Sequence, residues 1–513
     1  MNFVSKKEMT INKNNTIAGG VLLVTLVTLF VKVLGFIKQM VIAYVYGASS
    51  STDVFFISSE FITNIASAIF SALSVMLIPI YLNKPKDERN KLLSDIVWSF
   101  LFISIIIVII GELFADPLAT LLRGGSSNID NNELAYYLRV LIPTLLITCI
   151  VFIYKSVLDA EKVFVPGRLL GAIQSVTIIA FSLTLSSYFG VKALLFAFCL
   201  ATVLEWLLLS FYVKGDYRKQ KPILFSDNFK VLFKQMLPLC IGSTIADISV
   251  IIDKIIAANL GAGVASSLAY GQTLKQFVSA SIIMTCISVV FVYLSETIAN
   301  KDKEKTIYLI NKTVSVNALI LIPVSIVSFV CSSDIVQILF ERGAFSHDDT
   351  VVVSSILRGY SIGFVFLAGR AIFSRVCYAF QDTISPMING IIAICFNIVL
   401  SIVLSRFLGA LGITIATSLA YLVSSILLYF SVKKKLPEYS ISHNFSFVVK
   451  IAVAMIICIA LVYLFLKYIN ISPVFNLFAG TVISFVVFYG VLALLKCKEL
   501  GYCYELVLHF TKK

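Results

Sequence analysis

The sequence has 513 residues, of which 59% are hydrophobic and 13% are charged, and its formal net charge is +13 at pH 7. So apolar a chain cannot present an ordinary aqueous surface, which excludes a soluble globular protein. The basic residues collect in short segments between apolar stretches, so the positive charge indicates membrane topology and contact with anionic lipid rather than nucleic-acid binding.

Apolar stretches long enough to cross about 30 Å of hydrocarbon recur along the whole chain. They are continuously apolar and lack a two-residue alternation, which predicts helices rather than barrel strands. We therefore predict an all-α polytopic membrane protein with about fourteen transmembrane helices. The predicted spans are 18–45, 53–83, 92–122, 133–158, 165–188, 191–213, 229–258, 264–297, 307–331, 350–378, 385–405, 409–432, 447–469 and 474–495.

The chain contains an internal repeat. Four pairs of segments match at an offset that stays between 214 and 220 residues, and they are YKSVLDAEKVFVP with FSRVCYAFQDTISP, DPLATLLR with DIVQILFER, GVKALLFA with GALGITIA, and IAYVYGA with IAANLGA. Repeats of about 200 residues in an apolar chain are typical of secondary transporters, whose substrate site lies between the halves. Six crossings per copy predict a parallel repeat.

This repeat predicts the domain organisation. The expected parts are a six-helix lobe at 1–214, a basic cytoplasmic linker at 215–228, a second six-helix lobe at 229–432, a cytoplasmic loop at 433–446, two further helices at 447–495 and a cytoplasmic tail at 496–513. Lysines and arginines gather in the loops that this arrangement places inside, and few lie at the outer ends. We therefore expect both termini to be cytoplasmic.

Residue types that carry covalent chemistry are sparse. Ten cysteines are scattered singly, without a C-x-x-C pair, and the three histidines are His347, His443 and His509. We expect no Cys/His metal site, no catalytic triad and no cofactor, and we interpret the cysteines as polarizable filler in the helices.

Charged residues inside apolar spans are more informative, because each costs several kcal/mol unless it reaches water or an opposite charge. Lys32 and Lys38 flank Gly35 in the first span, and a spacing of six places them about 240° apart on an ideal helix. We expect a break at Gly35 or an aqueous cavity; snorkelling of the lysines is the alternative. Further charges in the spans are Asp53, Glu60, Asp247, Asp253, Lys254, Lys275, Arg358, Arg370 and Arg375. The basic excess in spans one, eight and ten indicates a cationic cavity that faces an anion.

Three motifs resemble those of one family. The segment DIVQILFERGAFSHDDT at 334–350 contains LFERGAF followed by DT, which is similar to the signature of bacterial lipid II flippases, the MviN/MurJ family. KVLGFIKQMVIAYVYGASSSTD at 32–53 resembles the first helix and following loop of that family, and YAFQDTISP at 378–386 resembles a third motif. The family belongs to a superfamily that also contains O-antigen flippases and multidrug exporters with the same twelve-helix core.

The resemblance implies a fourteen-helix fold with a central cationic cavity for a polyprenyl-diphosphate headgroup. The family has essential arginines in its first helix, where this chain has Lys32 and Lys38, which keep the charge but lose the bidentate geometry toward phosphate. Two other family arginines align with Ala66 and Thr273. The residues expected at the headgroup are Lys32, Lys38, Asp53, Lys254 and Lys275.

Some members of that family carry a sodium site in the second lobe. By motif alignment its ligands fall on Asp253, Asn397, Ser401 and Thr417. The family's second carboxylate is Ser401 here, so a single charged ligand remains. Na⁺ is therefore an expected coupling ion, and hydrogen bonds that pack the helices are the alternative interpretation of the same four residues.

The resemblance predicts a transporter rather than an enzyme: a flippase that moves lipid II from the inner to the outer leaflet of the bacterial cytoplasmic membrane by alternating access. The expected partners are a polyprenyl-diphosphate-linked glycan, membrane lipid and cell-wall synthesis proteins, and no nucleic acid. The alternatives are a flippase for a capsule or O-antigen glycan, a multidrug exporter of the same superfamily, and a membrane glycan polymerase using Glu341, Asp348 and Asp349 in the outer connection near 332–349.

Overall fold

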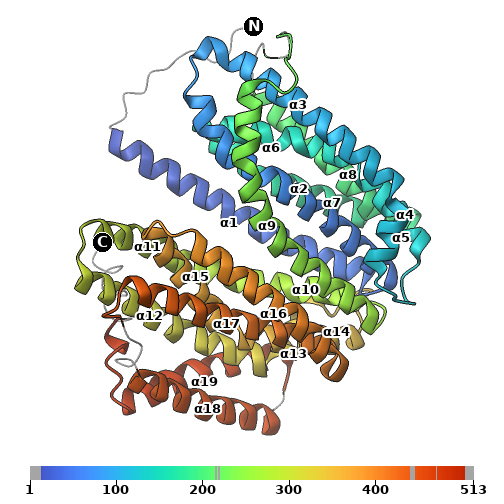
Figure 1. Cartoon of the computed structure of the whole chain (residues 1–513). Helices are drawn as coiled ribbons and strands as arrows, with labels where there is room; N and C mark the ends of the chain where they lie inside the picture. The colour runs from blue at the N-terminus through green and yellow to red at the C-terminus, as the bar shows by residue number, and fades with distance from the viewer. Residues whose placement is uncertain (1–12, 214–216, 218–219, 440–444, 470, 503–513) are drawn as a thin grey trace. The chain divides into compact units, whose positions relative to one another are not determined.

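The computed structural model describes residues 13–213, 217, 220–439, 445–469 and 471–502 (Figure 1). Residues 1–12, parts of the 215–228 linker and of the 433–446 loop, and most of the 496–513 tail, including His443 and His509, lie outside the described residues. The described residues form helices and connecting segments without a β-strand, which confirms the predicted all-α class.

The described residues of the first half of the chain form eight α-helices. Their bounds are α1 Lys13–Tyr46, α2 Ser50–Leu82, α3 Lys86–Leu113, α4 Ala115–Arg123, α5 Asn131–Leu141, α6 Thr144–Ala160, α7 Phe164–Phe189 and α8 Lys192–Tyr212. The second half repeats this order, and two helices follow it. Their bounds are α9 Asp227–Leu260, α10 Val264–Val278, the π-helix η2 Ser279–Ile283, α11 Met284–Ala299, α12 Lys303–Val330, α13 Ser332–Phe340, α14 His347–Ile362, α15 Phe364–Ala379, α16 Ile384–Leu408, α17 Ala410–Lys435, α18 Phe445–Tyr468 and α19 Pro473–Leu494.

The internal repeat is visible in lengths and bends. α1 and α9 each have 34 residues, α3 and α12 each have 28, and the short helices α4 and α13 each have 9. The pairs α5–α6 and α14–α15 are bent by 41° and 45°. Lys162 and Gln381 have φ of 63° and 60°, and Gly190 and Gly409 have φ of 56° and 58°. Local backbone geometry is therefore shared between the halves, as the four sequence matches predict.

Ten helices of the described chain are long and apolar enough to cross a membrane, or twelve if each bent pair forms one span. The repeat adds α9, which carries several charges, and the rod of α10, η2 and α11, which a π-helix interrupts. Counting these two as spans agrees with the fourteen expected. Proline explains one bend, because Pro143 has no N–H to continue the helix between α5 and α6.

Two boundaries differ from those predicted. The expected span 92–122 ends at Leu113, and the separate helix α4 follows it. α4 is held by its own contacts, since Asp116 forms an ion pair with Arg139 of α5 at 2.7 Å. The connection near 332–349, which is predicted to be outer, also contains the helix α13. Both short helices lie outside the long spans.

The chain packs as two compact units that interleave along the sequence. One unit contains residues 1–41, 69–111 and 140–240, and the other contains 42–68, 112–139 and 241–513. α1, α2 and α9 therefore contribute residues to both. The lobes expected at 1–214 and 229–432 follow the repeat in sequence, and their bounds remain a prediction.

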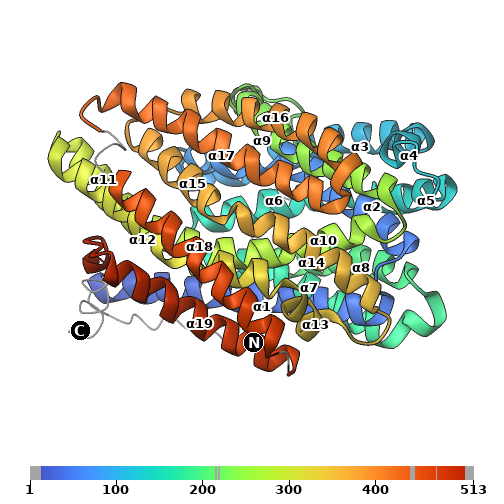
Figure 2. The ribbon, with the colours of Figure 1, turned by 90° about the horizontal axis from the view of Figure 1, so that it is seen from below.

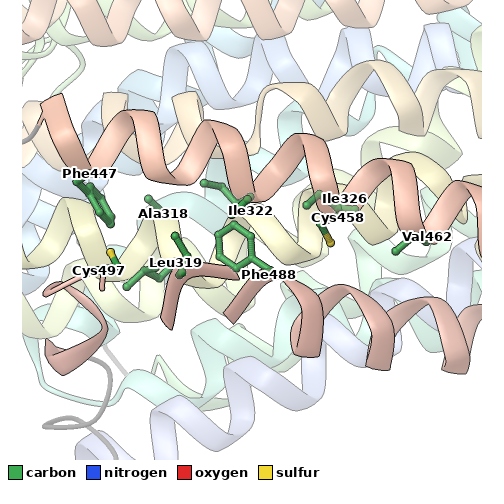
Figure 3. Close-up of a cluster of buried hydrophobic side chains, with 11 residues drawn as sticks. Ala318, Leu319, Ile322, Ile326, Phe447, Cys458, Val462, Phe488 and Cys497 are labelled. Carbon is green, nitrogen blue, oxygen red and sulfur yellow. The ribbon is translucent and has the colours of Figure 1, made fainter. Parts of the chain in front are cut away.

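The two extra helices α18 and α19 pack against α12 within the second unit, and Figure 2 shows both of them beside it. A buried apolar cluster joins the three helices (Figure 3). It includes Leu319 and Ile322 of α12, Cys458 of α18 and Phe488 of α19. Helix α19 also reaches α13, because Nδ2 of Asn476 donates to Oδ1 of Asp334 at 3.1 Å. The appended pair is thus an integral part of this unit.

Candidate functional site

The two lysines of α1 have different surroundings in the first unit. Lys32 is exposed, whereas Lys38 is half-buried and its charge acts on the carboxylate of Glu205 in α8. α1 remains helical through Gly35, where a Cβ would meet no atom within 4 Å. Of the two predicted alternatives, the break at Gly35 is therefore wrong, since a single glycine costs a helix only about 1 kcal/mol and does not by itself interrupt it. An aqueous surrounding for both lysines stays a prediction.

Asp53 of α2 is fully buried in the second unit. Its Oδ2 accepts the backbone N–H of Gly263 at 2.7 Å, and its Oδ1 accepts that of Ser266 at 2.6 Å. These N–H groups stand at the N-terminus of α10, where a helix leaves donors without internal partners and favours a negative charge. Asp53 therefore caps another helix, and these contacts favour an anchoring role over the expected headgroup contact.

Lys254 of α9 is also buried, and its Nζ lies 2.5 Å from Oε1 of Glu60 in α2. The ammonium sits over the ring of Phe56 as well, 5.1 Å from the centroid. Its charge is further attracted by Asp53. In this arrangement Lys254 is committed to carboxylates of its own chain, so it is not presented to an external anion.

Lys275 of α10 lines a cavity of about 220 Å³ in the second unit. Its Nζ lies 3.4 Å from the hydroxyl of Tyr421 and 4.5 Å from the ring centroid of Tyr360. Arg370 of α15 lines the same cavity and stacks over Tyr421 at 5.8 Å. Two cationic side chains therefore reach this cavity, and aromatic rings hold both.

The four expected cation ligands come together at this cavity from three helices. The hydroxyl of Ser401 donates to Oδ1 of Asp253 at 2.9 Å, and Nδ2 of Asn397 donates to Oγ1 of Thr417 at 3.3 Å. Oδ1 of Asn397 accepts the hydroxyl of Ser249 at 2.9 Å. The motif alignment thus selected residues that are in contact, and the observed hydrogen bonds are also those expected if the group only packs the helices.

The donor set fits a free cation poorly. Oxygen ligands suit Na⁺, but Asp253 is the one carboxylate among the described residues that line the cavity, and Lys275 and Arg370 line it too. The Lys275 charge already acts on Asp253. A free cation would enter a low-dielectric cavity whose side chains carry a net positive charge, which is unfavourable. The predicted sodium site therefore stays a prediction, and the charges around it argue against it.

Acids offset much of the basic charge expected in this unit. Lys254, Lys275 and Arg370 are accompanied by the carboxylates of Asp53, Glu60 and Asp253, whereas Arg358 contacts Ser332 and Arg375 lies over the ring of Phe291. Lys254 and Lys275 were expected to bind the anionic headgroup, because the sequence does not show that these carboxylates lie near them. Two further residues of the cavity, Ser249 and Tyr421, could have been found from helical spacing. Each lies four residues from an expected ligand, Asp253 or Thr417, and thus on the same helix face.

The LFERGAF motif folds against the end of α1. The N–H of Ala344 donates to the carbonyl of Tyr44 at 2.8 Å. A Cβ on Gly343 would lie 2.2 Å from that carbonyl oxygen, and one on Gly47 would lie 2.4 Å from the carbonyl oxygen of Ala344. Both glycines have positive φ. This motif therefore makes a close backbone junction that only glycine permits at these positions.

The carboxylates of the same motif are used within the loop. Glu341 accepts the hydroxyl of Thr350 at 2.7 Å, and Asp349 with Ser346 forms a capping box at the start of α14. His347 lies 3.3 Å from Glu341. Asp348 lies in the first turn of α14. These contacts order the segment between α13 and α14 and support no assignment of Glu341 or Asp349 as catalytic acids.

The third motif, YAFQDTISP, runs from the end of α15 into the start of α16. Oδ1 of Asp382 accepts the N–H groups of Ile384 and Ser385, and its Oδ2 lies 3.0 Å from Nζ of Lys435 at the end of α17. Burial raises the pKa of Asp382, but hydrogen bonds from Ser385 and the charge of Lys435 outweigh it and lower the pKa to about 2. Asp382 therefore joins the ends of two neighbouring helices.

The family model and the curated relatives that match this chain carry the same description. The family model described as "Lipid II flippase MurJ" matches residues 42–487. A probable lipid II flippase MurJ of Buchnera aphidicola subsp. Acyrthosiphon pisum is 24% identical and covers 94% of this chain and 98% of its own length. The lipid II flippase MurJ of Thermosipho africanus is 25% identical over 80% of this chain and 85% of its own length.

Solved structures give the same fold. A lipid II flippase MurJ in an inward closed conformation superposes with a TM-score of 0.80, at 24% identity, over 92% of this chain and 98% of the other. An inward-facing multidrug resistance MATE transporter superposes with a TM-score of 0.66, at 15% identity, over 81% and 98%. Because the family model covers most of its length, this chain belongs to the lipid II flippase MurJ family.

Proposed function

We propose that this protein is a flippase that moves lipid II, a polyprenyl-diphosphate-linked glycan, from the inner to the outer leaflet. The observation that carries the proposal is the family match over residues 42–487. The many-span helical fold supports it, since a lipid-linked headgroup must cross hydrocarbon that excludes charge. The family's membrane is bacterial, and the basic loops at 84–91 and 433–435 favour cytoplasmic termini.

Lys32 and Lys38 are the residues we assign to the diphosphate. A diphosphate in a low-dielectric passage needs cationic partners, and charge-assisted hydrogen bonds to phosphate are among the strongest available. Lysine supplies a point charge without the fork of arginine, so it tolerates several headgroup orientations. The exposure of Lys32 supports this assignment, whereas the ion pair of Lys254 with Glu60 removes Lys254 from the set.

The mechanism we infer is alternating access without a covalent step. The headgroup enters from the cytoplasmic side, meets the α1 lysines and leaves on the outer side, while the polyprenyl tail stays in lipid. Membrane potential suffices in principle to drive the return of a basic site, because one elementary charge across 100 mV corresponds to about 2.3 kcal/mol. The outer carboxylates Glu341 and Asp349 are engaged in hydrogen bonds, which favours transport over glycan polymerisation.

Depletion and replacement test this proposal. Cells that express only Lys32→Ala or Lys38→Ala should accumulate lipid II in the inner leaflet, at normal protein levels in the membrane, and the arginine variants should flip it normally. Lys467→Ala, at the exposed end of α18, is the matched control and should have no effect. Accumulation of a different lipid-linked glycan would replace lipid II with a capsule or O-antigen substrate. Normal flipping by both alanine variants would contradict the assignment of the headgroup site.

A further inference from the structure

Among the described residues, the cavity at α9, α10, α16 and α17 is lined by one acid, Asp253, and on another helix by Lys275, a base that the chain itself supplies. Asp253 accepts the hydroxyl of Ser401, and Lys275 acts on it electrostatically from α10. Both side chains line the same cavity of about 220 Å³. A buried carboxylate stays ionised only if a positive charge or hydrogen bonds compensate it, and otherwise it takes up a proton. Here the positive charge that can compensate Asp253 is the ammonium of Lys275, a side chain of the protein itself.

Lys275 is held in a way that suits a resident cation. Its ammonium has the hydroxyl of Tyr421 at 3.4 Å and the ring of Tyr360 at 4.5 Å, and a polar oxygen and an aromatic face are both partners for a cation in an apolar site. A free cation that entered the cavity would also face Arg370, which lines it. With two bases and one acid present, a further free cation would add to an existing positive excess.

The helix that carries Lys275 also differs from its counterpart in the first half. α10 ends at Val278 and continues into the π-helical turn Ser279–Ile283, whereas α2 continues unbroken from Ser50 to Leu82. Single π-turns inside helices concentrate at functional sites and mark places where a helix changes direction. Lys275 lies one turn before this interruption, so the tethered charge sits at a point where its helix is able to adjust.

We propose that the ammonium of Lys275 is the cation of this site and that it takes the place of a free sodium ion beside Asp253. The site is therefore complete without a bound ion, and transport by this protein does not depend on a sodium gradient. The part of the inference that concerns transport rests on the proposed flippase function. The part that concerns ion binding does not, because it is measured on the purified protein.

The experiment compares melting temperatures of purified protein in detergent, in sodium chloride and in choline chloride at equal concentration, so that screening is matched. The wild type and Lys275→Arg should melt at the same temperature in both salts. Lys275→Met removes the charge with little change in length. This variant should melt lower in choline chloride and recover by about 2 °C or more in sodium chloride, because a ligand that binds the folded state stabilises it.

A double variant keeps the test decisive if Lys275→Met is unstable. Asp253→Asn with Lys275→Met leaves no carboxylate that needs a compensating charge, so it should melt above Lys275→Met in choline chloride and should not respond to sodium. Two results would overturn the proposal. One is a wild type that sodium stabilises and whose response Asp253→Asn removes, since an ion would then bind beside Lys275. The other is a Lys275→Met protein as stable as the wild type in choline chloride and indifferent to sodium.

Discussion

The ion pair of Lys254 and Glu60 predicts an asymmetric cost when either partner is neutralised. The Lys254 side chain is 2% exposed and that of Glu60 is 31% exposed. Removing one partner of a buried pair costs about 3–5 kcal/mol, because the other charge is left uncompensated. Glu60→Gln strands the buried ammonium, with the nearby Asp53 as its remaining counter-charge. We therefore expect this variant near the lower end, at about 3 kcal/mol.

The reverse change should cost less. Lys254→Met leaves a Glu60 carboxylate that keeps about a third of its surface exposed and is able to meet water, so we expect about 1–2 kcal/mol. Thermal unfolding of purified protein should place Glu60→Gln about 5 °C below the wild type and Lys254→Met between them. The double variant should recover most of the loss, since a neutral buried pair is often tolerated. Equal shifts, or a larger shift for Lys254→Met, would refute the reasoning.

Two further predictions concern the motif loops. Gly343→Ala should destabilise the protein by at least about 2 kcal/mol more than Gly125→Ala in the same unfolding assay. Both glycines have positive φ, but only at Gly343 would the added Cβ lie 2.2 Å from a carbonyl oxygen. Equal losses would show that φ alone matters. Asp382→Asn should lower the melting temperature at pH 7. Because the folded pKa is depressed to about 2 from 3.8, the stabilisation is present above about pH 4 and is lost as the pH falls through 2, so the two melting curves should converge there; a constant difference would contradict the linkage.

The sequence predicted the helical class and the repeat because both depend on patterns that any membrane chain must show. A span has to be apolar over its whole length, and a duplicated unit keeps the turns that only certain backbones allow, as Gly190 and Gly409 do. The end of α3 has no such sequence pattern. Residues Leu113 and Phe114 continue an apolar run, so the sequence offers no local signal that α3 ends at Leu113 and that α4 begins at Ala115. By contrast, Pro143 offered a local signal for the bend between α5 and α6.

The candidate site shows the same limit: the sequence reveals its charged residues but not the partners that they contact. Asp253 and Lys254 are neighbours in sequence, and different ligands are expected for them: a sodium ion for Asp253, by motif alignment, and the substrate headgroup for Lys254. Successive residues of a helix point about 100° apart, so the two side chains leave α9 toward different partners. Asp253 meets Ser401 of α16, and Lys254 meets Glu60 of α2. One position on α9 thus carries the carboxylate that lines the cavity, and the next pairs with a carboxylate of another helix. Charge alone cannot separate these roles, because only the partner across the packing interface decides whether a buried lysine is available to a substrate.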